Sequence, residues 1–250
     1  MKIKYLLPFA ITLLTLLQSC SITAENTYHK DATSSMLMTM NMKEALDMLK
    51  NMGDSSTTKS PIDFSKYPKT WESLYTVEKN AAEKKGQQYD AVGDSAEVMK
   101  KVFTKQNLDE NGEMNGFSLK YDHLANEELK ILSKLNSKNK DPFSSVDFME
   151  WDGKKLVIIL DQLNPENLMK DSKSEGKEEM AQMKSMLQMF KMNYTNTIRF
   201  DQKIAKIEGK HDWISQKDDH TILLNIDLSK IIDPDSKLKN SDPKIIITTK

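Results

Sequence analysis

Cysteine is nearly absent from this sequence: among 250 residues there is one, Cys20. A single thiol excludes an intrachain disulfide framework. It also excludes the paired Cys-x-x-Cys arrangements that bind metals or carry out redox exchange. Any role of Cys20 is therefore one that a lone thiol performs.

Arginine is equally scarce, because Arg199 is the only arginine among 36 basic residues. The 36 basic residues are balanced by 37 acidic ones, which gives a net charge of -1. A general electrostatic hold on nucleic acid needs an excess of positive charge. The guanidinium fork that suits phosphates and guanine edges is almost missing as well. We expect no nucleic-acid partner.

Signatures of catalysis are also missing, since the chain has no GxSxG, no HExxH and no P-loop. The four histidines are scattered along the sequence: His29, His123, His211 and His220. The segment that begins at Asp109 has acidic spacing similar to a calcium-binding loop. However, Met114 stands where glycine is needed and Lys120 where the bidentate glutamate belongs. We expect no enzyme activity, no cofactor and no metal site.

The one notable apolar run is short and lies at the start of the chain. Lys2 and Lys4 form a positive leader, and residues 5–17 follow as the apolar stretch. At about 1.5 Å per residue, this stretch would span roughly 20 Å as a helix, short of the ~30 Å hydrocarbon core. A charged start, a short apolar middle and a small residue before the break are typical of a secretory signal.

The run ends in Leu17-Gln18-Ser19-Cys20, which resembles the lipobox of bacterial lipoproteins: Leu at -3, a small residue at -1 and Cys at +1. In that family the cysteine thiol is joined to diacylglycerol. Signal peptidase II then cuts before the cysteine, and the new amino group is usually acylated. The resemblance implies that residues 1–19 are a lipoprotein signal peptide and that Cys20 is the lipidated first residue of the mature protein.

Two or three acyl chains hold a protein to a bilayer far more firmly than one chain does. Ser21 follows the cysteine, where an aspartate would suggest retention at the inner membrane in some bacteria. We therefore expect an exported protein that is anchored to the outer membrane through acyl chains on Cys20, on its periplasmic or surface face. Residues 20–34 are expected to form a lipidated tether.

The rest of the chain alternates between strand-like and helix-like patterns. Apolar residues recur at every second position over 36–42 and 116–124, whereas helical spacing marks residues 43–52, 126–135 and 178–192. Asp152-Gly153 between two strand-like runs indicates a hairpin with a type I′ turn. We expect this hairpin in the central sheet, with Val157 and Ile159 packed inward. Four further strand-like runs between residues 194 and 228 suggest a strand meander, and residues 245–249 suggest a closing strand. Over residues 35–250 we expect a single α+β domain, with a mainly antiparallel sheet and helices packed on one face.

Methionine is abundant, with 16 copies beside 8 phenylalanines. Met36, Met38, Met40 and Met42 alternate on one strand, and further methionines recur every three residues over 180–192. Flexible thioether side chains fill irregular cores well. They also suit an apolar-ligand pocket, and soft sulfur is a ligand for Cu(I). Our leading hypothesis is a non-enzymatic lipoprotein with a binding or structural role, similar to uncharacterised exported bacterial lipoproteins. The alternatives are a carrier or sensor of an apolar ligand and methionine-based copper handling.

Overall fold

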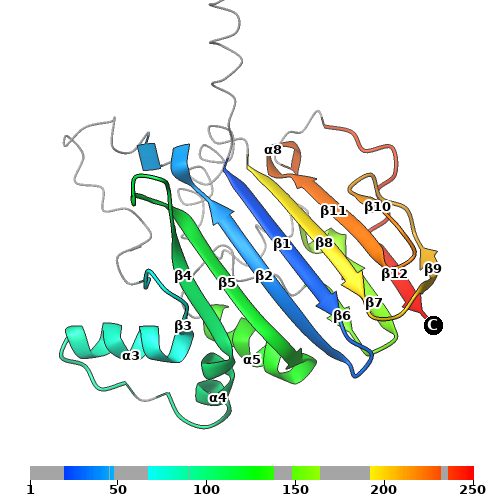
Figure 1. The fold of residues 1–250 in the computed structure, drawn as a ribbon. Coiled ribbons are helices and arrows are strands. Elements are labelled where there is room, and N and C mark those ends of the chain that lie inside the picture. Colours follow the sequence, from blue (N-terminus) through cyan, green and yellow to red (C-terminus); the bar gives the residue numbers. More distant parts are fainter. Residues whose placement is uncertain are drawn as a thin grey trace, which may run out of the picture.

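A computed structural model describes residues 20–44, 46, 47, 67–89, 91–137, 148–163, 192–231 and 236–250. These residues form two β-sheets and a small group of helices (Figure 1). Within this described part, no helix is both long enough and apolar enough to cross a bilayer. The sequence-based fold class, a mainly antiparallel α+β domain, is confirmed.

The larger sheet has eight strands in the order β10-β11-β8-β1-β2-β5-β4-β3. Its strands are β1 (Ser21–Tyr28), β2 (Thr33–Asn41), β3 (Glu72–Ser73), β4 (Val102–Leu108), β5 (Met114–Ala125), β8 (Asn193–Phe200), β10 (Ile214–Gln216) and β11 (Thr221–Asp227). The β1–β8 pair is parallel, and the other pairs in this sheet are antiparallel. Met36, Met38 and Met40 lie on β2, as their spacing predicts, and Met42 follows its last residue.

A second sheet of four strands, β6-β7-β12-β9, packs against one half of the large sheet. Its strands are β6 (Met149–Trp151), β7 (Lys155–Ile159), β9 (Ile204–Glu208) and β12 (Lys244–Thr249). Leu156 and Ile158 of β7 share one core cluster with Ile198 of β8 and Ile222 of β11. This cluster is the apolar layer between the two sheets.

Helices cover the other half of the same sheet face. They are α3 (Leu74–Lys84), α4 (Asp94–Lys101) and α5 (Asn126–Ser137), with the short η3 (Leu160–Leu163) and α8 (Leu228–Ile231) near the second sheet and the end of β11. Val98 of α4 and Leu132 of α5 pack with Tyr121 and Leu124 of β5. Helices lie on one face, as expected, and the second sheet completes the cover of that face.

The expectation that residues 20–34 form a tether is wrong for residues 21–28. They form β1, which lies in the interior of the large sheet between β2 and β8. Ile22, Ala24, Asn26 and Tyr28 point into the core, with exposed or partly exposed residues between them. Because two of the four inward residues are small or polar, the alternation in this strand is weak when judged by hydrophobicity.

The Asp152-Gly153 hairpin is present, but it belongs to the second sheet rather than the central one. The sequence-based expectation was that Val157 and Ile159 point into the core. In the structure the fully buried residues of this strand are Leu156 and Ile158. The turn also differs from type I′, which needs positive φ at two successive residues, because Gly153 has φ 92° and neither neighbour is positive.

The late strand-like runs do not form one meander. β8, β10 and β11 join the large sheet, whereas β9 crosses to the second sheet and pairs with β12. The closing strand is confirmed as β12. The helix expected over 178–192 falls almost wholly outside the described residues.

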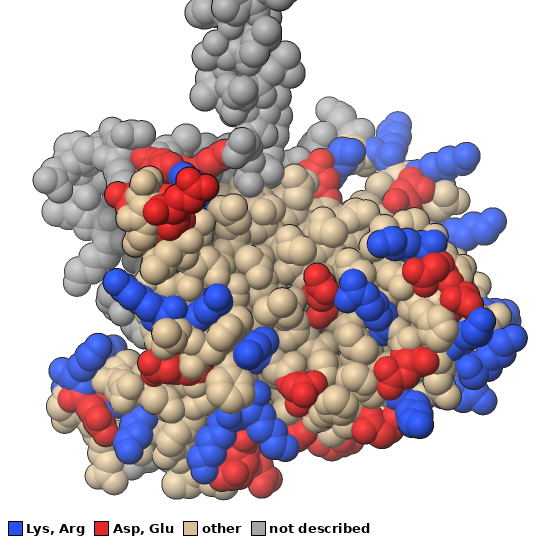
Figure 2. All heavy atoms as spheres, in the orientation of Figure 1, with Lys and Arg blue, Asp and Glu red and all other residues tan. Residues whose placement is uncertain are grey.

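No described element covers the other face of the large sheet, which is the face turned to the viewer in Figure 2. Lysines and acidic residues are interspersed there without a large patch of one sign. Glu25 of β1 and Arg199 of β8 form one such mixed pair, with 2.8 Å between carboxylate oxygen and guanidinium nitrogen.

Candidate functional site

Cys20 lies immediately before β1 and already takes part in the sheet ladder. Its carbonyl oxygen accepts a hydrogen bond from the Asn193 backbone N–H at 3.1 Å. The residue is 5% exposed in the full-length chain and packs with Ile22, Met40 and Phe117. The expected lipidation point is thus joined to a central strand without an intervening linker.

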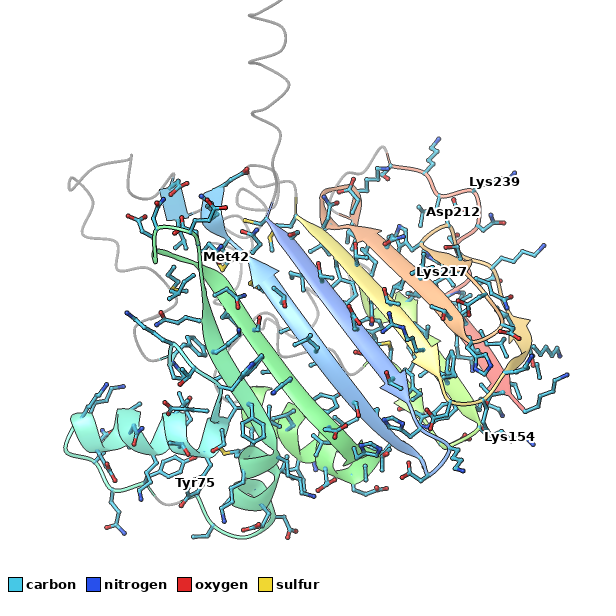
Figure 3. All side chains as sticks on the ribbon, viewed as in Figure 1. Met42, Tyr75, Lys154, Asp212, Lys217 and Lys239 are labelled. Atoms are coloured by element: carbon cyan, nitrogen blue, oxygen red, sulfur yellow. The ribbon has the colours of Figure 1, made fainter. Side chains whose placement is uncertain are left out.

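Met38, Met40 and Met42 lie at this same end of the sheet. Met40 is 1% exposed, which confirms the expectation that it serves as core, and Met38 and Met42 are partly buried beside it. Figure 3 places Met42 near the end of the large sheet where β1 begins. Met183 and Met186, whose three-residue spacing predicts burial in the core of a helix-covered sheet, lie outside the described residues.

A cluster of polar side chains occupies the opposite end of β1. Because β1 and β8 run parallel with Tyr28 opposite Phe200, the residues that follow each strand, His29 and Asp201, meet at one sheet edge. Nδ1 of His29 lies 3.2 Å from Oδ2 of Asp201. The backbone carbonyl of His29 accepts a 2.8 Å bond from the indole N–H of Trp151, which fixes the start of the turn.

A β-bulge in β5 brings two more side chains to the cluster. Ser34 pairs with Leu124 and Met36 with Tyr121, so Ser35 alone faces both Asp122 and His123. His123 has φ 50°, in the left-handed region that non-glycine residues rarely occupy. Bulges redirect side chains. Here Asp122 and His123 both contact Ser35 as a result.

Ser35 links the two histidines and the carboxylate. Its hydroxyl donates to Oδ1 of Asp122 at 2.6 Å and accepts from the backbone N–H of His123 at 3.1 Å. Nε2 of His29 is 2.9 Å from the same hydroxyl oxygen, and Nδ1 of His123 is 2.8 Å from Oδ1 of Asp122. The Ser35 hydroxyl, followed by the His123 ring, holds the pKa of the Asp122 carboxyl below its ordinary value.

The chain Ser35–His29–Asp201 has the connectivity of a nucleophile, a base and an orienting acid. The hydroxyl proton, however, is directed at Asp122, because a carboxylate without a proton can only accept at 2.6 Å. The Ser35 proton is therefore committed to Asp122 and not to His29 Nε2, whereas nucleophilic catalysis needs the base to take that proton.

Three ligand atoms in this cluster are close enough to share a metal ion. One donor each from His29, Asp122 and His123 lies within 4.8 Å of the others. The two imidazole rings stack with centroids 4.0 Å apart and planes 7° from parallel. Sequence reasoning treated these histidines as scattered, because they are far apart in the chain and only the pairing of β2 with β5 brings them together.

The other two histidines have local structural roles. His211 is buried against Trp213, and burial lowers the pKa of its imidazole. His220 lies next to the carbonyl oxygen of Phe200, with 3.0 Å between that oxygen and Nδ1.

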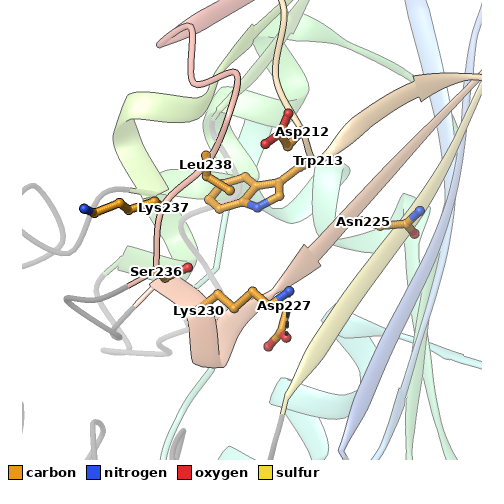
Figure 4. A pocket seen from close by; sticks show the side chains of 8 residues that line it. All are labelled: Asp212, Trp213, Asn225, Asp227, Lys230, Ser236, Lys237 and Leu238. Atoms are coloured by element: carbon orange, nitrogen blue, oxygen red, sulfur yellow. Dashed lines mark ion pairs between the residues drawn. The ribbon is translucent and has the colours of Figure 1, made fainter.

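A groove of about 540 Å³ opens between the end of β11, α8 and the segment that begins at residue 236 (Figure 4). Its lining combines acidic, basic and apolar side chains: Asp212, Trp213, Asn225, Asp227, Lys230, Ser236, Lys237 and Leu238. The Asp212 carboxylate already accepts bonds from the backbone N–H groups of Lys239 and Asn240 and from the Asn240 amide. Lys230 lies 4.0 Å from Asp227. The groove therefore offers few uncommitted charges.

Two buried asparagines form a polar strip inside the core. Asn196 donates to the Tyr194 hydroxyl at 3.0 Å, and burial raises the pKa of both Tyr194 and Tyr28 nearby. Within the described part of the chain, the side-chain oxygens of Asn26 and Asn196 have no hydrogen-bond donor. Such oxygens are normally satisfied by a partner, an ordered water or a ligand.

No family model and no curated protein matches the sequence. Among solved structures, the chain is similar to the folded domain of the Mycobacterium tuberculosis protein LppM, determined by NMR. The TM-score is 0.42 and the identity 10%, over 93% of this chain and 90% of that domain. A likeness of this size carries no argument about function.

Proposed function

We propose that this protein is an exported lipoprotein, anchored to the outer membrane through acyl chains on Cys20, whose domain has a non-enzymatic binding or structural role. The observation that carries the proposal is the lipobox-like Leu17-Gln18-Ser19-Cys20, which contains the only cysteine in the chain. The direction of the Ser35 hydroxyl proton toward Asp122 supports the non-enzymatic part.

The position of Cys20 gives the anchor a mechanical consequence. Because β1 begins at the next residue, the acyl chains attach directly to a central strand. The proposal therefore puts the Met42 end of the large sheet against the bilayer and the His29 end away from it. Over the eight residues of β1, at about 3.3 Å per residue, the two ends are roughly 26 Å apart. Cys20 is nearly buried in the full-length chain, so we expect its thiol to be modified before β1 joins the sheet.

Metabolic labelling with a fatty-acid probe tests the anchor. Wild-type protein should incorporate the probe and partition into the detergent phase, whereas Cys20→Ser should do neither and should keep residues 1–19. Ser19→Ala is the matched control, because it keeps a small residue before Cys20 and should label like the wild type. Equal labelling of Cys20→Ser would overturn the proposal.

A second candidate, a carrier of an apolar ligand, is favoured by the buried oxygens of Asn26 and Asn196. A mostly apolar molecule with a hydrogen-bond donor for each oxygen would satisfy them. Organic extraction of protein purified natively from membranes, followed by mass spectrometry, should then release one ligand class in stoichiometric amount. Asn196→Leu should lose it. Extraction that yields only a mixture of bulk membrane lipids would count against this role.

A further inference from the structure

We propose that His29, Asp122 and His123 form a binding site for a late first-row divalent metal ion, with Zn²⁺ as the reference ion. Imidazole nitrogen and carboxylate oxygen are the donors that such ions take. The three donor atoms lie within 4.8 Å of one another. Donors on one tetrahedral Zn²⁺ are roughly 3.3 Å apart, so side-chain rotation has to bring these donors together to complete the site. Three protein ligands leave one position for water or an external ligand.

Asp201 supplies the second feature that metal-binding histidines share. A ligating histidine usually donates its other ring N–H to a carboxylate, which fixes the tautomer and the ring orientation. Nδ1 of His29 lies 3.2 Å from Asp201, and this leaves Nε2 directed at Ser35 and toward Asp122. Asp201 comes from β8 and His29 from the end of β1, so the parallel pairing of these strands builds the contact.

The strained backbone of His123 is the third feature. A non-glycine residue held at positive φ costs free energy and tends to occur where the site has a use for it. The bulge does not improve packing, because the His123 side chain is 54% exposed and that of Asp122 is 81% exposed. The bulge instead brings Asp122 and His123 to Ser35, on the same side as His29.

In the present arrangement the two rings are stacked, so their nitrogens do not converge on one point. Metal binding requires His123 to rotate off His29, and its exposure leaves it free to do so. The side chain of His29 is 14% exposed and held by Asp201 and Ser35, so it is the fixed ligand. We therefore expect His29 to determine the affinity for the metal ion and His123 to complete the set of ligands by rotating.

The test measures Zn²⁺ binding by the full chain, purified in detergent and stripped with a chelator. Competition with a chromophoric indicator gives stoichiometry and Kd, and Co²⁺ substitution gives a visible absorption spectrum that reports the donor set. The variants are His29→Gln, His123→Asn and Asp201→Asn. Asparagine tolerates positive φ, so His123→Asn removes the imidazole without disturbing the bulge. His220→Gln is the control, because His220 lies outside the cluster, two strands from β1.

Wild type and His220→Gln should bind one equivalent with the same Kd. His29→Gln and His123→Asn should bind at least about 10-fold more weakly. Asp201→Asn should weaken binding by about 10–100-fold, the usual effect of removing the partner of a ligating histidine, while the Co²⁺ spectrum keeps its form. The proposal is overturned if wild type shows no saturable uptake at about 100 μM Zn²⁺. It is also overturned if circular dichroism shows folded His123→Asn and its Kd equals that of wild type.

Discussion

The layer between the two sheets depends on a few fully buried aliphatic residues. Leu156 and Ile158 of β7, Ile198 of β8 and Ile222 of β11 are each 0% exposed. On β7 the neighbouring Val157 and Ile159 face the other way and are only partly covered. In a two-sided strand of continuous apolar residues such as 156–160, sequence cannot tell which side is the core, and the structure decides it.

Ile158→Ala should therefore lower the free energy of unfolding by about 2–5 kcal/mol, the range for truncating a fully buried aliphatic side chain. Val157→Ala is the matched control on the opposite side of the strand, and its loss should be less than half as large. Urea denaturation followed by circular dichroism measures both. Equal losses would show that the two sides of β7 are equally buried.

Asp212, which lies just before β10, accepts hydrogen bonds from residues 239 and 240. The Asn240 amide, followed by the backbone N–H groups of Lys239 and Asn240, lowers the pKa of its carboxyl. Since the folded pKa lies below the unfolded one, the stabilising contribution is present above the unfolded pKa. It is lost as the pH falls through the folded pKa, in the window below about pH 4.

Removing the amide by Asn240→Ala should raise the pKa of Asp212 toward its ordinary value. An NMR titration of the side-chain carboxyl measures the shift. Asn225→Ala, in the same groove but without a described bond to Asp212, should leave the pKa unchanged. A pKa that does not move in Asn240→Ala would mean that the amide is not the main cause.

At the scale of elements, prediction from sequence succeeded where the local pattern carries the information. The alternation at Met36–Met38–Met40 predicts β2, and the apolar spacing after Asn126 predicts α5. β1 was missed because Ala24 and Asn26, two of its four inward positions, do not read as hydrophobic. The polar cluster was missed for a different reason: its members come from β1–β2, β5 and β8, and only strand pairing brings them together.

The pairing of β2 with β5 depends on Gly116. A Cβ at Gly116 would lie 1.9 Å from the carbonyl oxygen of Met40 on the neighbouring strand, so β2 and β5 approach only because Gly116 has no side chain. Gly116→Ala should cost about 3 kcal/mol, at the upper end of the range for overpacking. Gly112→Ala, in open space in the preceding turn, should cost about 1 kcal/mol from its positive φ alone. Thermal and urea unfolding compare the two, and similar losses would contradict the close approach.

At the scale of the whole molecule, the proposed lipid anchor and the polar cluster lie at opposite ends of the large sheet. Cys20 precedes β1 directly, and β1 ends at the residue before His29. One central strand thus connects the proposed lipid attachment point with the proposed metal ligands. The hairpin turn at Gly153 packs closely against Ala32 at the His29 end of the sheet. A Cβ at Gly153 would lie 3.2 Å from the Ala32 side chain. Figure 3 places Lys154 at this end, opposite Met42.

The central claim is that Cys20 is the lipidated first residue of the mature protein. The most direct measurement is the mass of the amino-terminal peptide of protein purified from membranes of the native host. The account predicts a peptide that begins at Cys20 and carries a diacylglyceryl group on the thiol, with or without a further acyl chain on the amino group. A peptide that begins at another residue, or an unmodified Cys20, would contradict it.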